Sequence, residues 1–310
     1  MANLRNRVAY LPISFFSMVM GLAGLTIAWQ KAQHTFDVDL SINLLLVSLT
    51  SGAFVLLLLL YIAKYVTNHD LVLKEFKNPV KLHFFPTISI SLLLISIAFL
   101  QFGQNISLPI WLAGSSIHLL FTFYVVNAWL HHDHFEVQHL NPAWFIPAVG
   151  NVLVPVAGVQ LGFVEISWFF FSIGMLFWVI LLTIIFNRIM FHNPMQDKLI
   201  PTLFILIAPP AVGFIAYMKL TGELDAFARI LYFAGLFLTM LMFIQVKRFA
   251  KLQFFLSWWA YSFPLAAITI ASFYMHELTH MLAYQYIAAA LLALLTIVVM
   301  FLLYKTTVAV

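Results

Sequence analysis

Apolar runs as long as a membrane-crossing helix recur along this 310-residue chain, and they constrain its fold more than any other feature. A bilayer core of roughly 30 Å requires about 20 consecutive apolar residues in a helix. Ten such runs lie at approximately 8–30, 40–66, 82–102, 107–130, 144–163, 166–191, 200–219, 224–246, 253–276 and 281–304. We therefore expect an all-α integral membrane protein with ten transmembrane helices, in which residues 1–310 form a single domain.

The composition supports this class. Hydrophobic residues make up 64% of the chain and charged residues 8%, which is too little charge to cover a soluble domain. There is no cysteine, so disulfides and thiolate metal sites are excluded. The basic residues are spread in ones and twos between apolar runs, which indicates membrane topology and no nucleic-acid partner.

The basic residues also orient the chain. With the N-terminus in the cytoplasm, twelve Lys and Arg lie inside and three outside, as the positive-inside rule requires. The inside set is Arg5, Arg7, Lys64, Lys74, Lys77, Lys81, Arg188, Lys198, Lys247, Arg248, Lys251 and Lys305, and the outside set is Lys31, Lys219 and Arg229. We predict a multi-pass protein of the plasma (inner) membrane with both termini cytoplasmic.

Prolines separate the odd-numbered runs from the even-numbered ones. Connections after odd runs are short, so the chain is predicted to form five helical hairpins. Eight prolines lie in odd runs, and only Pro109 lies in an even one. A proline beyond the first turn bends a helix, and the freed carbonyl needs protein or water to satisfy it. We expect five bent odd helices around a central path with five straighter helices outside; a solid bundle whose kinks only improve packing is the alternative.

The predicted path holds few groups that bind ions strongly. No charged residue lies in the middle of an odd run, and the polar groups there are hydroxyls and one amide. Coupled carriers usually keep ionisable groups at membrane depth, so this pattern favours passive conduction. Phe263 precedes Pro264 among small neighbours, where a large ring at a bend can obstruct a pore.

Four stretches are distinctive: "LPISFFSMVMGLAGLTIAW" (11–29), "NPAWFIPAVGN" (141–151), "PTLFILIAPPAVGFIAY" (201–217) and "WWAYSFPLAAITIAS" (258–272). Together they resemble the tellurite-resistance and dicarboxylate transporter family, which includes TehA-like proteins and slow-type anion channels. The resemblance implies five hairpins in quasi-fivefold arrangement around a pore lined by odd helices, in a homotrimer. It also implies that Phe263 occludes the pore. Since the runs begin and end close to the ends of this chain, control through phosphorylated cytoplasmic tails is not expected.

Further pore-lining candidates follow from position on odd runs beside bends or matched stretches. They are Phe16, Gly21, Pro86, Asn151, Pro209 and Pro264. The sequence thus predicts a passive channel for small anions, without enzymatic activity, cofactor or metal. The alternative is a proton-coupled secondary transporter for C4-dicarboxylate, sulfite or tellurite.

Three histidine features compete with this interpretation. "HELTH" (276–280) matches the HExxH zinc-protease pattern, but it lies at the outer end of a span and lacks an obvious third ligand. "HHDHFEVQH" (131–139) is interpreted as a solvated cytoplasmic loop, with metal binding and pH sensing as alternatives. His118, in the middle of an even run, is predicted to form hydrogen bonds between helices.

Overall fold

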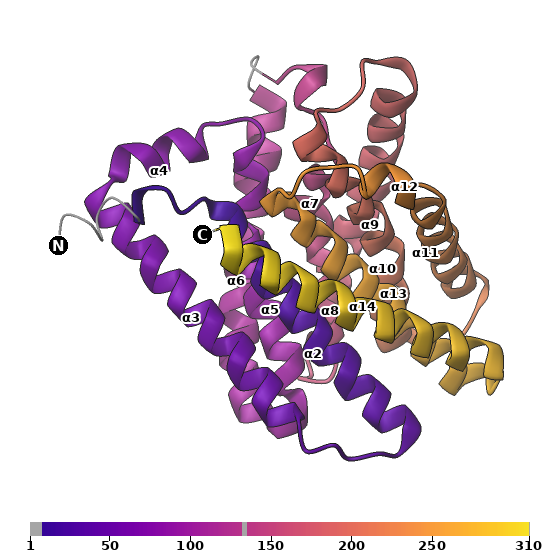
Figure 1. Ribbon diagram of the computed structural model, residues 1–310. Helices are drawn as coiled ribbons and strands as arrows, with labels where there is room; N and C mark the ends of the chain where they lie inside the picture. The colour runs from indigo at the N-terminus through magenta and orange to yellow at the C-terminus, as the bar shows by residue number, and fades with distance from the viewer. Residues whose placement is uncertain (1–7, 132–134, 310) are drawn as a thin grey trace.

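The computed structural model describes residues 8–131 and 135–309, and Figure 1 shows its arrangement. Within these residues nine helices are long and apolar enough to cross a membrane, and no strand occurs. The remaining predicted run, 144–163, is helical only in short pieces between Pro142 and Gly158. An all-α membrane protein is therefore confirmed, while the count of ten crossings stays a prediction.

Five of the spans are single uninterrupted helices, which we call the outer helices. They are α3 (Asn43–Thr67), α6 (Gln104–His131), α9 (Val164–Phe191), α11 (Ala226–Ile244) and α14 (Leu282–Ala309). Only 28% to 39% of the most apolar stretch of each is buried. Continuous helices satisfy their own backbone groups, so such exposed surfaces can face lipid.

The other five spans, which we call the inner segments, are interrupted. Four of them begin with a 3₁₀-helix and continue as an α-helix, and the fifth, Pro142–Gly158, alternates between the two. The pairs are η1 (Ile13–Phe15) with α2 (Phe16–Phe36), η2 (Lys81–Phe84) with α5 (Thr87–Phe99), η7 (Asp197–Ile207) with α10 (Ala208–Thr221), and η8 (Leu256–Tyr261) with α13 (Ser262–Thr279). The fifth segment holds η5 (Pro142–Trp144), α7 (Phe145–Val149), η6 (Gly150–Leu153) and α8 (Val154–Gly158).

Prolines stand where the inner segments change helix type. Pro155 and Pro209 lie in the first turns of α8 and α10, and Pro264 is the third residue of α13. A proline cannot donate a backbone hydrogen bond, so at these junctions it interrupts the bonding that would otherwise continue from the 3₁₀-helix into the α-helix. The predicted distortion of the odd runs is confirmed, but it is a change from 3₁₀- to α-helix rather than a kink within one α-helix.

The inner segments contact one another in a closed order. Contacts run from α2 to α5, α8, α10 and α13, and α13 packs along α2. Each outer helix packs on the inner segment before it: α3 on α2, α6 on α5, α9 on α7 and α8, α11 on α10, and α14 on α13. Buried shares of 61% to 94% for the long inner spans, and complete burial of Pro142–Gly158, separate the two layers. A quasi-fivefold symmetry of this arrangement stays a prediction.

The remaining short elements join the spans. They are α4 (His69–Phe76), η3 (Leu100–Phe102), η4 (Val137–His139) and α12 (Val246–Phe249). Figure 1 shows α4 and α12 at the end where the inner segments begin, with the turn between α2 and α3 at the opposite end. At that opposite end the Asp225 carboxylate caps α11 by accepting from the Ala228 amide (2.8 Å). It also accepts from the Tyr217 hydroxyl, and the two bonds lower the pKa of the carboxyl.

Candidate functional site

A cavity of about 540 Å³ opens among the inner segments at the end where they begin. Within the described part of the chain, all five inner segments and the short connections before them form its wall, and no outer helix contributes. Along the five inner segments, in chain order, the deepest wall residues are Met20, Ile90, Leu153, Val212 and Pro264. The bundle is therefore hollow over the first half of its inner segments, which argues against a solid packed centre.

Phe263 lies at the deep end of this cavity. Between Tyr261 and Phe273 every other residue is buried, whereas Phe263 is half-buried and forms part of the wall. Just beyond it, Ala267 on α13 and Ala23 on α2 are buried. The ring of Phe263 therefore faces the space that the cavity opens, next to the level at which the wall residues end.

The structure divides the predicted pore-lining residues into two groups. Pro209 and Pro264 share the wall with Phe263. Phe16, Gly21, Pro86 and Asn151 lie outside the wall. Phe16, Gly21 and Asn151 contact neighbouring helices, and Pro86 bonds within its own segment.

Each residue of the second group has a packing partner. Phe16 packs edge-on against Phe54 and Tyr61, with ring centroids about 6 Å apart. A β-carbon on Gly21 would lie 2.2 Å from the Ser262 hydroxyl, so this glycine allows α2 to approach α13 closely. The carbonyl of Pro86 accepts from the Ser89 hydroxyl (2.8 Å).

Asn151 and His118 belong to a polar contact between α6 and its inner neighbours. The Asn151 amide donates to the Thr122 hydroxyl (3.0 Å) and to the Ala148 carbonyl (2.7 Å). The His118 Nδ1 lies 2.9 Å from the Ser89 hydroxyl, which confirms the predicted interhelical hydrogen bond. These groups hold an outer helix on the inner layer instead of facing the cavity.

Most hydroxyls of the inner segments bond to carbonyls of their own helix. Thr26, Ser91, Ser262 and Thr269 each donate to a carbonyl three or four residues earlier, at 2.6 to 2.9 Å. Ser14, Ser17 and Ser257 are the wall residues with hydroxyls. The surface available to an ion is therefore mainly apolar, with a few hydroxyls near the open end.

The rim of the cavity carries two lysines that the sequence analysis used only to orient the chain. Lys81 and Lys198 belong to its wall, together with His139 and the amides Asn78, Gln138 and Gln196. Among described residues the wall includes no carboxylate. The open end therefore presents two ammonium groups without an acid in the wall itself.

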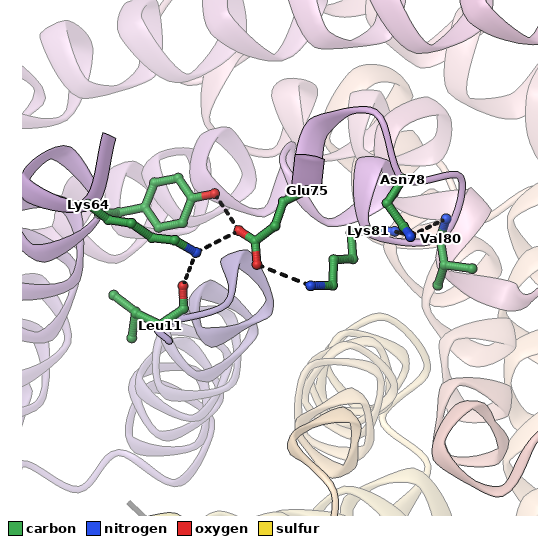
Figure 2. Close-up of polar contacts among 7 residues, drawn as sticks. Leu11, Lys64, Glu75, Asn78, Val80 and Lys81 are labelled. Atoms are coloured by element: carbon green, nitrogen blue, oxygen red, sulfur yellow. Dashed lines mark hydrogen bonds and ion pairs between the residues drawn. The ribbon is translucent and has the colours of Figure 1, made fainter. Parts of the chain in front are cut away.

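Lys81 is tied to a buried carboxylate beside the rim, as Figure 2 shows. Glu75, on α4, accepts from Lys81 (3.3 Å), from the buried Lys64 (3.0 Å) and from the Tyr61 hydroxyl (3.0 Å). Lys64 also donates to the carbonyl of Leu11 (2.7 Å). One carboxylate thus joins α3, α4, the start of η2 and the chain before η1.

The HELTH stretch has a local structural role. Glu277 accepts from Lys31 and from the Thr35 hydroxyl (2.9 Å), so its carboxylate links α13 to α2. His280 has a left-handed backbone (φ 55°) where α13 ends. In the described residues no three His, Cys, Asp or Glu side chains are grouped as metal ligands.

The second histidine-rich stretch is described only in part, because His132, Asp133 and His134 lie outside the described residues. His139 Nδ1 accepts from the Glu136 amide (3.1 Å), and this residue belongs to the cavity wall. One histidine of the stretch therefore stands at the rim.

Broken inner helices around a cavity, enclosed by continuous outer helices, define a class of membrane protein in which one chain surrounds its own cavity. The family described as voltage-dependent anion channel matches residues 10–307, so the chain belongs to that family. This confirms the resemblance noted in the sequence.

The sequence identity to three individual relatives is low, at 26% to 27%. The chain is 27% identical over 307 residues to the S-type anion channel SLAH3 of Arabidopsis thaliana, covering 95% of this chain and 48% of that protein. It is 26% identical over 264 residues to the tellurite resistance protein TehA homolog of Haemophilus influenzae, covering 83% and 79%. An uncharacterized transporter of Methanocaldococcus jannaschii is 26% identical over 283 residues, covering 84% and 82%. The chain spans about half the length of the plant relatives SLAH3 and SLAH2.

Proposed function

We propose that the protein is a passive channel for small anions and that Phe263 closes its pathway. The observation that carries the proposal is the cavity whose wall comes from all five inner segments and ends beside Phe263. Family membership and the names of the S-type anion channel relatives support it. The pathway would continue beyond Phe263 along the same segments once the ring moves.

The chemistry of the wall supports weak binding of anions. Two lysines at the rim attract negative charge, and the rest of the wall is mainly apolar, so it binds an ion only weakly. The described wall includes no carboxylate, and its one histidine, His139, stands at the rim, so no acid or imidazole lies in the deep part of the cavity where coupled carriers usually keep one. Conduction without a fixed proton stoichiometry is the simplest function of such a wall.

The gate is tested by replacing Phe263 with alanine in protein reconstituted into planar bilayers. We expect anion conductance to increase on the order of tenfold or more, which corresponds to a barrier lowered by about 1.4 kcal/mol. The fold should survive because the side chain already borders open space. Phe237→Ala is the matched control, since Phe237 is 59% exposed on α11 and faces away from the inner layer.

Reversal potentials separate the channel from a coupled transporter. In gradients of chloride, nitrate, sulfite or malate, a channel's reversal potential follows the anion gradient alone. The reversal potential of a proton-coupled transporter would also shift with the pH gradient, by an amount that the coupling stoichiometry fixes. Wild-type current in Phe263→Ala would overturn the gate, and a pH-dependent reversal potential would overturn passive conduction.

We further propose that the open end of the cavity faces the cytoplasm, that the protein resides in the plasma membrane as a homotrimer, and that it has no enzymatic activity. The positive-inside distribution supports the orientation. The largely unburied apolar faces of the outer helices are suited to contact with lipid or with other subunits. The mass of the protein extracted in lipid nanodiscs tests the trimer: a single-chain mass would exclude it.

A further inference from the structure

Lys81 occupies a defined position at the rim of the cavity. Its backbone amide and that of Val80 donate to the Asn78 side chain, at 2.9 and 3.0 Å. Its ammonium is held at the other end by the Glu75 carboxylate (3.3 Å). A lysine fixed at both ends loses much of the freedom that a surface lysine normally has.

The bonds around Glu75 leave Lys81 as the accessible charge of the cluster. The Lys64 side chain is only 2% exposed and Glu75 9%, whereas half of the Lys81 side chain is exposed. Two ammonium groups share one carboxylate, so the cluster has a net charge of one positive unit. Lys64 and Glu75 line the second pocket but expose little of their side chains, so the excess charge is presented mainly by Lys81.

Lys81 also belongs to two adjoining spaces. It forms part of the wall of the central cavity and of a second pocket of about 530 Å³ beside it, with Asn78 common to both. An anion that enters the central cavity from the side of the second pocket therefore passes this ammonium. Lys198, across the wall, has no ion pair among the described residues and no comparable tether.

We propose that Lys81 is the residue that concentrates anions at the entrance of the pathway, and that Glu75 is the positioning residue that holds it at the rim. This inference rests on the proposed anion channel. The buried Lys64–Glu75 pair then has a functional consequence, because it fixes the position of the Lys81 ammonium, which carries the net positive charge of the cluster.

The absence of cysteine from the chain allows a direct test. The Lys81→Cys variant offers thiol reagents a single target, and the exposure of Lys81 makes that target accessible. In roughly 10 mM salt on the side of the rim, where the screening length is about 30 Å, we expect current carried by anions entering there to fall about two- to threefold. A cationic methanethiosulfonate reagent should restore the current, and an anionic one should lower it further.

The salt dependence of the current distinguishes electrostatic attraction of anions by Lys81 from a change in the shape of the pore. In about 1 M salt, where screening reduces the Debye length to about 3 Å, the variant and the wild type should carry equal current. Lys81→Arg should behave as wild type. Lys77 lies four residues before Lys81 and outside both pocket walls. Lys77→Gln removes the same charge at a greater distance from the pathway, so it should lower the low-salt current by less than Lys81→Cys does.

The positioning role of Glu75 needs a test at constant net charge. The double variant Lys64→Met/Glu75→Gln removes one charge of each sign and leaves Lys81 untied. If Glu75 holds Lys81 at the rim, adding Lys81→Gln to this double variant should reduce low-salt current by less than it does in the wild type. An equal reduction in both backgrounds would overturn the positioning role.

The outcomes separate this inference from the function on which it rests. Absence of anion current in the wild type at any salt concentration would overturn the channel itself. Normal current with the same salt dependence in Lys81→Cys, before and after both reagents, would overturn only the role of Lys81.

Discussion

At the scale of single residues, the cluster around Glu75 contains a buried ion pair, Lys64 with Glu75. Burying an ion pair is costly, and its attraction offsets the cost only when the remaining donors and acceptors are satisfied. Here Glu75 accepts from Lys64, Lys81 and Tyr61, and Lys64 has a second acceptor in the Leu11 carbonyl. The pair is thus stable as a unit, while either partner alone is not.

Replacement of Glu75 alone should destabilise the protein. Glu75→Gln leaves the buried ammonium of Lys64 without its counterion, so we expect the free energy of unfolding to fall by about 3–5 kcal/mol. Thermal unfolding of the detergent-solubilised protein measures the loss.

The double variant Lys64→Met/Glu75→Gln should recover most of this stability, because it buries no charge. A single variant as stable as the wild type would show that Lys64 finds water or another acceptor in place of Glu75.

At the scale of secondary-structure elements, the contact between α2 and α13 depends on small residues. Gly21 and Gly24 lie one turn apart on α2, facing Ser262 and Ala266 on α13. A β-carbon on Gly24 would be 2.8 Å from the Ala266 β-carbon and 3.5 Å from the ring of Phe263. Close approach of this kind is how helices associate in membranes, where the hydrophobic effect does not drive them together.

Alanine at Gly21 should therefore separate these helices. Its β-carbon would overlap the Ser262 side chain, at 2.2 Å from the hydroxyl oxygen, and overpacking of this kind costs about 1–3 kcal/mol. We expect a lower unfolding temperature together with altered conductance, since α13 carries Phe263.

Gly52→Ala is the control for this substitution. Gly52 is in the outer helix α3, and its added β-carbon would have no neighbour within 4 Å. It should leave conductance unchanged and should not lower stability, because alanine is the better helix former. Equal effects at Gly21 and Gly52 would contradict the packing argument.

At the scale of the whole molecule, charge and architecture agree on one orientation. The rim lysines and the exposed Lys251 lie towards the end where the inner segments begin, and Arg229 lies near the opposite end, beside the start of α11. Under the positive-inside rule this distribution supports the proposal that the first end faces the cytoplasm.

Thiol labelling in intact cells tests the orientation, again using the cysteine-free chain. A membrane-impermeant maleimide added outside should label the Arg229→Cys variant and not the Lys251→Cys variant. After permeabilisation both should be labelled. The reverse pattern would invert the proposed orientation of the cavity.

The sequence predicted the layers of the fold better than the wall of the cavity. A proline has no backbone amide to donate, so prolines mark where a regular helix is interrupted, and their distribution identified the inner segments. Pro209, Phe263 and Pro264 lie on these segments and belong to the wall. Phe16 could not be oriented in the same way, because helices that are apolar on every side give no sign of which face is inward. Asn151 faces Thr122 on α6, a contact that only the packing of the helices reveals.

Polar residues were ambiguous for a different reason. A hydroxyl in a membrane helix can bond to its own preceding turn, as Thr269 does with Leu265, and then offers little to an ion. In the sequence, Lys81 was only one of the twelve basic residues predicted to lie in the cytoplasm. Its contact with Glu75 depends on how α4 folds back beside η2, which the sequence does not show.

The packing of α13 along α2 also constrains how the protein is made. Hairpins enter the membrane in chain order, yet α2 meets its neighbour α13 only after more than two hundred further residues have been synthesised. Until then the glycine-bearing face of the first hairpin has no native partner. The nascent protein must pass through an open, unclosed stage, and only the arrival of the last hairpin completes the wall.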